Sequence, residues 1–532
     1  MQIEPAVEEF AARYAARSPQ VVWTTLVADL ETPVSAFLKV TGFLKVAGAR
    51  PKRAASSDAP PASFLLESVE GGAVRGRYSI IGLEPDLIYR AIGRNAEINR
   101  DAQADPRGFA PTAEPPLAAL RSLIEESRVA LPDRLPPMAA GVFGYLGYDT
   151  VRLIEECLPA PGADPIGIPD AILVRPTVVI VFDAVEDTIT VVTPVRPQKG
   201  VSAKQALSRA RTRLSRIVDA LDGPLDKSSP LPPLVNEQKD EGGPREVAPR
   251  SNTSHAEFKH MVLRAKEYIA AGDIFQVVLS QRFEAPFALP PFALYRALRR
   301  VNPSPYLFFL DFGAFAIAGS SPEILVKTGG GVVTIRPIAG TRRRGATPHE
   351  DEALEAELLA DPKERAEHLM LLDLGRNDVG RVAEIGTVKV TDQFFVERYS
   401  QVMHIVSNVE GELRKDSDSL AALAAGFPAG TVSGAPKVRA MQIIDELEKE
   451  KRSLYAGCVG YFSAGQEMDT CIALRTALIK DGVMYVQAGA GIVADSDPDF
   501  EQQECINKAK ALFRAAEEAQ RFASAARGRQ QG

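Results

Sequence analysis

The sequence lacks an excess of basic residues: 62 Lys and Arg stand against 69 Asp and Glu in 532 residues, a net charge of −7. A nucleic-acid-binding surface is therefore not expected. The four cysteines, Cys157, Cys458, Cys471 and Cys505, match no metal or redox spacing, which argues against a disulfide framework and a structural zinc site. The longest apolar runs, such as 178–182, are too short to span a membrane. The opening residues contain no apolar core, so we expect no secretory signal and a cytoplasmic enzyme or large binding protein.

Shifts in composition indicate how the chain is divided, and its length allows three or four domains. Short β-branched runs with turns dominate the first part and include a hairpin around 184–187. A polar insertion rich in Pro, Ala and Ser occupies 48–63. The predicted divisions are an N-terminal domain (1–195), a helix with a mobile linker (196–253), a second domain (254–519) and a frayed tail (520–532). Strands and helices alternate irregularly in the second domain, which predicts a layered α+β fold.

Helix-start signals recur along the second domain. Ser254 and Glu257 form a capping box ahead of a run with apolar residues at helical spacing. Pro348 and Pro362 each stand in the first turn of a further predicted helix. A last helix is expected from about 497 to 519.

Three familiar motifs are matched only superficially. Residues 489–494 fit the dinucleotide pattern G-x-G-x-x-A, but Asp495 and Asp497 stand where a helix N-terminus should hold a phosphate. Residues 430–437 lack the G-K-[ST] ending of a phosphate-binding loop. Cys458 lies in a G-C-V-G segment with no histidine after it, whereas a cysteine nucleophile needs a base.

Two glutamates on predicted helices have more than one possible role. Glu367 borders a leucine-rich helical face, where it is either a solvated rim charge or a metal ligand. Glu504 is spaced to form an ion pair with Lys508 one turn later, or to act as a second carboxylate for Mg²⁺.

Arg475 lies within an apolar strand predicted at 471–479, where a charge needs a partner. A structural carboxylate and a substrate carboxylate suit it equally well. Gly489 and Gly491 permit close backbone approach, so their N–H groups could also hold a carboxylate. Taken together, these residues suggest a small polyanionic substrate bridged by Mg²⁺.

Four longer motifs make the chain recognisable: PIAGTRRRG (337–345), AEHLMLLDLGRNDVGR (366–381), FPAGTVSGAPKVRAM (427–441) and QAGAGIVADSDP (487–498). In this order they resemble the chorismate-utilising enzymes, and within them the large subunits of anthranilate synthases. The resemblance extends over most of the chain. It implies a sandwich of large, mostly antiparallel sheets flanked by helices. It also implies a Mg²⁺-dependent reaction of chorismate with ammonia that gives anthranilate and pyruvate, the first step of tryptophan biosynthesis.

The resemblance further implies roles for individual residues. Glu323 corresponds to the acid that protonates the departing C4 hydroxyl, and His404 to the histidine linked to pyruvate elimination. Without the resemblance, they would be interpreted as a turn glutamate and a core histidine. Glu367 and Glu504 correspond to the Mg²⁺ ligands. The implied chorismate-binding positions are Gly340, Thr341, Thr431, Tyr455, Arg475, Gly489, Ala490, Gly491 and Lys508.

Two positions discriminate among the relatives. Isochorismate and salicylate synthases carry a lysine base where this sequence has Gln276, which cannot accept a proton, so ammonia is favoured as the nucleophile. Aminodeoxychorismate synthases carry a lysine that can attack the ring where this sequence has Ala339. The alternatives kept open are component I of an aminodeoxychorismate synthase and a non-catalytic regulator that binds chorismate or tryptophan.

Feedback inhibition and a partner subunit are implied in the same way. The segments 65–68 and 302–309 resemble those that form the family's tryptophan site. They imply inhibitor-binding roles for Ser68, Pro305, Tyr306 and Leu307. The chain lacks a recognisable glutaminase, so we expect a separate glutamine amidotransferase subunit, component II of such enzymes, in a heterotetramer.

Overall fold

The computed structural model describes residues 1–46, 62–68, 76–225, 249–399 and 402–528. The predicted insertion at 48–63 and the predicted linker therefore lie largely outside the described residues. The strands are β1 (Gln20–Val27), β2 (Ser63–Glu67), β3 (Tyr78–Ile92), β4 (Asn95–Asn99), β5 (Ala110–Pro111), β6 (Gly141–Leu146), β7 (Ala171–Asp183), β8 (Thr188–Val195), β9 (Arg250–Ser251), β10 (Gln276–Pro286), β11 (Tyr306–Asp311), β12 (Ala316–Ser321), β13 (Ile324–Gly329), β14 (Val332–Ile335), β15 (Ile338–Arg343), β16 (Lys389–Arg398), β17 (Val402–Glu412), β18 (Gly434–Ala435), β19 (Cys458–Ser463), β20 (Met468–Ile472), β21 (Thr476–Lys480) and β22 (Val483–Ile492). The helices are α1 (Val7–Ala15), α2 (Pro33–Val46), α3 (Pro116–Glu126), α4 (Ala203–Asp222), α5 (His255–Ala270), α6 (Pro291–Val301), α7 (Pro348–Ala360), α8 (Pro362–Gly380), α9 (Ser419–Gly426), α10 (Gly430–Ser433), α11 (Lys437–Leu447) and α12 (Pro498–Gly528).

Two antiparallel runs of strands form the body of the protein. One run follows the order β1-β8-β7-β3-β2-β11-β12-β21-β22-β10. The other follows β3-β7-β6-β19-β20-β13-β14-β17, with β15 and β16 also paired to β17. The long strands β3 and β7 belong to both runs, and their register shifts between Pro85 and Leu87. Proline cannot donate to a ladder, which accounts for a break at this point.

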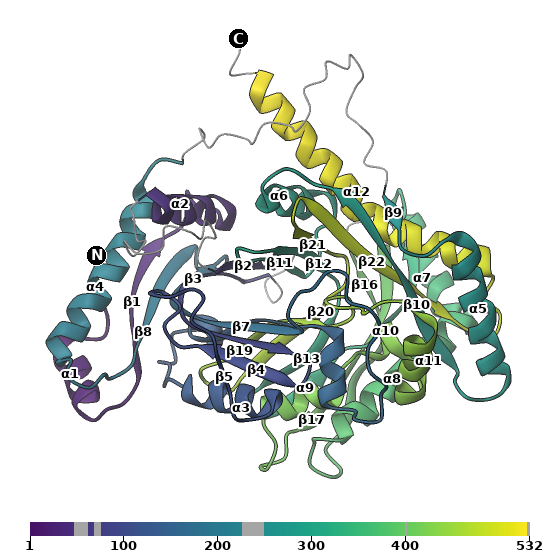
Figure 1. The fold of residues 1–532 in the computed structure, drawn as a ribbon, viewed down its shortest axis with the longest axis horizontal. Helices are drawn as coiled ribbons and strands as arrows, with labels where there is room; N and C mark the ends of the chain where they lie inside the picture. The colour runs from purple at the N-terminus through teal and green to yellow at the C-terminus, as the bar shows by residue number, and fades with distance from the viewer. Residues whose placement is uncertain (47–61, 69–75, 226–248, 400–401, 529–532) are drawn as a thin grey trace.

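Helices cover the outer faces of both runs. One core cluster combines side chains of α1, α2, α4, α6 and α12 with the first run, and another combines α3, α8, α9 and α11 with the second. A third cluster, which includes Phe143, Phe308 and Val459, joins side chains from both runs. Figure 1 shows α2, α6 and α12 on one side of the strands and α3, α8 and α9 on the other. The predicted sandwich of mostly antiparallel sheets flanked by helices is confirmed.

Each run contains strands from both predicted domains. β2 lies between β3 and β11, and β6 pairs with β19, so each run contains ladders that join the first 195 residues to residues beyond 254. Helix α4 packs with α1, α2, β1 and β8 rather than projecting as part of a linker. The domain boundaries themselves stay predictions.

Local sequence signals correspond closely to the observed helix ends. The capping box of Ser254 and Glu257 opens α5, and Pro348 and Pro362 stand at the first positions of α7 and α8. The predicted hairpin is the β7–β8 pair. Helix α12 continues to Gly528, further than expected, so the region predicted as a frayed tail from 520 begins as helix.

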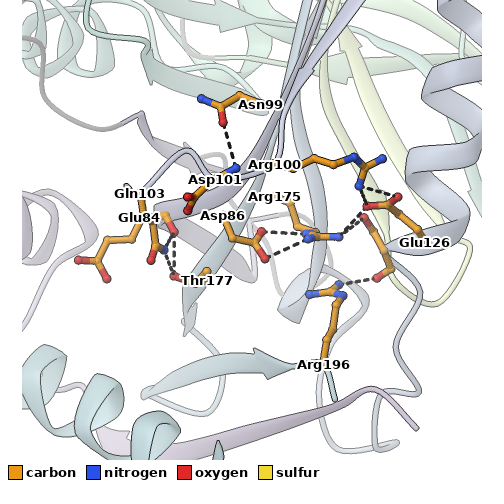
Figure 2. Close-up of polar contacts among 11 residues, drawn as sticks. Glu84, Asp86, Asn99, Arg100, Asp101, Gln103, Glu126, Arg175, Thr177 and Arg196 are labelled. Atoms are coloured by element: carbon orange, nitrogen blue, oxygen red, sulfur yellow. Dashed lines mark hydrogen bonds and ion pairs between the residues drawn. The ribbon is translucent and has the colours of Figure 1, made fainter. Parts of the chain in front are cut away.

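A network of ion pairs ties β3, β7 and α3 together in the N-terminal part. The Arg175 guanidinium contacts the carboxylates of Asp86, at 2.8 Å, and Glu126, at 3.2 Å. Arg196 donates at 2.9 Å to the carbonyl oxygen of Ser127, just past the end of α3 (Figure 2). Positive charge at a helix C-terminus is favourable, so these arginines anchor α3 to the strands.

Within the described part of the chain, every helix is too short or too polar to cross a membrane.

Candidate active site

His404 lies on β17 opposite a bulge in β15. The register shifts between Ala339 and Thr341, and the intervening Gly340 has φ +74°, a left-handed conformation that glycine adopts without strain. The bulge places the Gly340 carbonyl oxygen and the Thr341 hydroxyl each 3.0 Å from His404 Nδ1. Because a carbonyl oxygen can only accept, Nδ1 carries the proton and Nε2 is the basic nitrogen.

The surroundings of His404 keep its imidazole neutral. Burial lowers the pKa of His404 to about 4, and the positive charge of Arg475 contributes to the same shift. The ring also makes an edge contact with Tyr399, with centroids 5.5 Å apart. At neutral pH this histidine is therefore an uncharged base.

Glu323 lies in the short connection between β12 and β13 and is 6% exposed, so it is not a solvent-facing turn residue. Burial raises the pKa of Glu323 to about 8, while the Ile338 N–H, the Thr431 hydroxyl and the Arg475 charge lower it by smaller amounts. Its own N–H faces the Ser321 hydroxyl at 3.4 Å. A carboxyl group that stays protonated at neutral pH can act as a general acid.

Arg475 connects these two groups electrostatically, because its charge affects the pKa of both Glu323 and His404. The sequence pattern predicted one strand across this residue, and that prediction is wrong. The structure ends β20 before it and begins β21 after it, with Arg475 itself at φ +47°. Its carbonyl oxygen accepts the Ser320 N–H at 3.1 Å. A left-handed non-glycine residue is strained, and such strain is common at functional sites.

Strand β22 brings two glycines to the same region. A Cβ atom on Gly489 would lie 2.7 Å from Tyr455 Oη and 2.9 Å from the Leu279 carbonyl oxygen, so only glycine fits. A Cβ atom on Gly491 would likewise lie 2.4 Å from Gln276 Nε2. Ala490 points to the opposite face and is fully buried in the cluster with α5 and α11, so only its backbone could face a ligand.

Lys508 on α12 joins this strand to Glu504. Its ammonium donates to the Gly489 carbonyl oxygen at 2.9 Å and forms an ion pair with Glu504 at 2.6 Å. The Lys508 charge also lowers the pKa of His404. The end of β22, the start of α12 and the histidine therefore belong to one site.

Glu367 on α8 and Glu504 on α12 lie close enough for the charge of Glu504 to act on Glu367. Burial raises the pKa of Glu367, and the negative charges of Glu364 and Glu504 raise it further. Two carboxylates that repel each other are a suitable donor pair for a divalent cation. In the part of the chain that is described, no group of three or more His, Cys, Asp or Glu side chains could hold a metal ion. Mg²⁺, which takes one or two protein carboxylates and keeps waters and substrate oxygens, fits such a pair.

The structure thus brings together most of the residues expected at the substrate and metal sites. The Thr431 hydroxyl on α10 lowers the pKa of Glu323, and Tyr455, in the segment before β19, places its hydroxyl beside Gly489. Sequence reasoning missed Arg452, which is buried behind these residues. Arg452 ends a run of five charged residues (448–452), so the local sequence does not distinguish it from its solvated neighbours.

The residues expected at the inhibitor site lie where β2 and β11 pair. Glu67 is paired with Leu307, which places Ser68 at the strand end near Tyr306 and Pro305. The Tyr306 hydroxyl donates to Asp469 at 3.2 Å. Leu307 is 1% exposed and packs in the core, so its side chain lies under this surface rather than on it.

Comparison with known proteins identifies relatives over most of the chain. A family model described as chorismate binding enzyme matches residues 64–514. The chain is 55% identical over 517 residues to anthranilate synthase component 1 of Cereibacter sphaeroides, covering 97% of this chain and 98% of that protein. It is 46% identical over 493 residues to that of Pseudomonas putida, covering 92% and 93%.

Solved structures show the same fold. Anthranilate synthase component I from Streptococcus pneumoniae superposes with a TM-score of 0.70 at 36% identity, covering 92% of this chain and 99% of that one. The menaquinone-specific isochorismate synthase from Escherichia coli superposes with a TM-score of 0.66 at 20% identity, covering 96% and 99%.

Proposed function

The chain belongs to the chorismate-binding enzymes, as an anthranilate synthase component 1 homologue, and on that premise we propose that it converts chorismate and ammonia to anthranilate and pyruvate. The observation that carries the proposal is the pairing of a protonated acid with a neutral base around one arginine. Glu323 and His404 are both buried, and the charge of Arg475 lowers the pKa of both. At neutral pH, Glu323 can donate a proton and His404 can accept one.

The substrate's carboxylates are proposed to bind Arg475 and the backbone at Gly489–Gly491. The ladder between β21 and β22 ends at Val486. After Val486, among the described residues, β22 is paired with β10 on one side and has no strand partner on the other. Its outward N–H groups can donate to an anion. Lys508, Tyr455, Thr341 and Thr431 complete the proposed set.

Two proton transfers by this chain account for the chemistry. Ammonia forms a bond to ring C2 as the C4–O bond breaks, Glu323 donates the proton with which the hydroxyl leaves as water, and the new ammonium group releases a proton to solvent. In the second step, His404 Nε2 accepts the C2 proton, the C3–O bond breaks with its electron pair on oxygen, and the pyruvate enolate departs as the ring becomes aromatic. The enolate takes up a proton from solvent to give pyruvate. Glu367 and Glu504 are the residues that would hold Mg²⁺, whose charge would neutralise the ring carboxylate.

Ammonia is proposed to come from a glutamine amidotransferase subunit in a cytoplasmic heterotetramer. Support comes from three of the four cysteines: burial raises the pKa of the Cys458, Cys471 and Cys505 thiols, which does not suit a glutaminase nucleophile. Tryptophan is proposed to inhibit at Ser68, Pro305, Tyr306 and Leu307. Tyr306 is paired with Ser321, two residues before Glu323, so the inhibitor segment adjoins the acid.

The test uses the purified chain with chorismate, Mg²⁺ and an ammonium salt at alkaline pH. Anthranilate fluorescence should appear, and glutamine should replace ammonium only when the amidotransferase subunit is added. Chorismate left untouched would overturn the proposal. A non-fluorescent product aminated at C4 would instead support an aminodeoxychorismate synthase. That outcome is not expected, because Ala339 offers no nucleophile to attack the ring.

A further inference from the structure

Arg452 is a buried charge that the proposed reaction does not use directly. Its side chain is 1% exposed and pairs with Glu448, which is 6% exposed, through Nε at 2.9 Å and Nη2 at 2.6 Å. Nη1 donates to the Val432 carbonyl oxygen at 2.7 Å, and Nη2 also donates to that of Val278 at 2.6 Å. The planar fork of one guanidinium thus joins a carboxylate to two separate backbone segments.

The carboxylate of the pair extends the connection along β10. Glu448 Oε1 accepts the Ser280 N–H at 2.8 Å and the Ser280 hydroxyl at 2.9 Å. In the ladder between β10 and β22, Val278 is paired with Gly491 and Ser280 with Gly489. The ion pair therefore binds β10 at the two residues that lie beside the two glycines of the proposed anion site.

The guanidinium also reaches the opposite side of the site. Val432 follows Thr431 in α10, and the Thr431 hydroxyl lowers the pKa of Glu323. The Arg452 guanidinium lies 5.4 Å from the ring centroid of Tyr455, whose hydroxyl points toward the glycine strand. One buried pair therefore contacts α10 and Tyr455, where proposed substrate-binding residues lie, and also β10, the strand beside the two glycines.

We propose that Arg452 and Glu448 act as positioning residues, which fix the glycine strand, Thr431 and Tyr455 relative to one another without touching the substrate. This inference rests on the proposed function. A buried ion pair of this size contributes little net stability, because apolar side chains of similar volume often stabilise a fold as well or better. Apolar side chains, however, could not bond to the backbones of β10 and α10 together.

The experiment compares Arg452→Met with the double variant Arg452→Met/Glu448→Leu. The single variant leaves Glu448 as an uncompensated buried charge, so its melting temperature should fall. The double variant removes both charges and should recover most of that loss. If the pair positions the site, kcat for anthranilate formation should stay about 100-fold below wild type in both variants, because small misplacements of binding groups have effects of that size.

Two further variants separate a loss of stability from a loss of positioning. Arg175→Met removes another largely buried arginine, which pairs with Asp86 and Glu126 in the N-terminal part and lies outside the site; it should lower the melting temperature while kcat stays within about twofold. Arg452→Lys keeps the charge without the fork and should stay folded, with kcat reduced at least about tenfold.

Recovery of both stability and kcat in the double variant would overturn the positioning role, as would full activity in Arg452→Lys. Absence of anthranilate from the wild-type enzyme would overturn the proposed function, and this inference with it. The two failures are therefore distinguishable.

Discussion

Replacing Glu323 with glutamine tests the general acid through two independent properties. Glutamine has nearly the same shape as glutamate but has no proton to donate. Because the departing hydroxyl needs that proton, kcat/KM for chorismate should fall by about 10²- to 10⁴-fold. In the wild type, kcat/KM should decline as pH rises through the pKa of Glu323, about 8, and this decline should be absent from any residual activity of the variant.

The same substitution should change the pH dependence of stability. The pKa of Glu323 is raised from 4.5 to about 8 by folding, so between these values the folded protein holds a proton that the unfolded chain has lost. Wild-type stability therefore falls as pH rises through this window. At ~1.4 kcal/mol per pKa unit, the loss between about pH 5 and pH 8 is on the order of 4 kcal/mol, which Glu323→Gln should avoid.

The assay needs two measurements and one control. Anthranilate fluorescence is followed across pH with the concentration of free ammonia held constant, since ammonia itself titrates. Free energies of unfolding come from urea titrations at about pH 5 and about pH 9. Glu352→Gln, on an exposed face of α7, should change neither. A Glu323→Gln enzyme with more than a tenth of wild-type kcat/KM, or with a stability difference independent of pH, would refute the reasoning.

The base, the metal pair and the glycine strand give three further expectations. His404→Gln should lower kcat by about 10²- to 10⁴-fold. The pH dependence of wild-type kcat should show no inflection near pH 6.5, because the pKa of His404 is about 4. An inflection near pH 6.5 that disappears in the variant would contradict the role of His404 as a neutral base. Glu504→Gln should weaken magnesium binding, measured by calorimetry, by roughly tenfold or more; an unchanged affinity would exclude it as a ligand. Gly489→Ala should lower kcat/KM for chorismate at saturating ammonium by at least about tenfold, because the added Cβ would collide with Tyr455. Gly329→Ala is the control and should leave kcat/KM unchanged, because the space around Gly329 is open. Equal effects of the two substitutions would argue against close packing around Gly489.

Features fixed by local chemistry could be predicted from the sequence. The Ser254 capping box and the helices opened by Pro348 and Pro362 depend on groups only a few residues apart, and the structure contains each of them. The β7–β8 hairpin is local in the same sense. The site residues were found through longer motifs, since neither Glu323 nor His404 has a distinctive local pattern.

Features that depend on distant contacts were not visible. The pairing of β2 with β11 joins strands more than 230 residues apart, and nothing in either strand specifies its partner. The break at Arg475 was missed because apolar residues continue across it, so the pattern resembles one uninterrupted strand. Arg452 was missed because its role depends on Val278 and Val432, which only the fold brings near it.

One physical cause assigns both proton-transfer roles in this site. Burial favours the neutral form of every ionisable group, and it therefore raises the pKa of Glu323 and lowers that of His404. A neutral carboxylic acid is a proton donor and a neutral imidazole is a proton acceptor, so the same dry environment prepares one of each. Arg475 lowers both pKa values. A substrate with two carboxylates that pairs with Arg475 would offset this charge, so it would strengthen the hold of Glu323 on its proton and make His404 a stronger base. The bound substrate would thereby adjust the acid and the base for the two successive steps proposed for them.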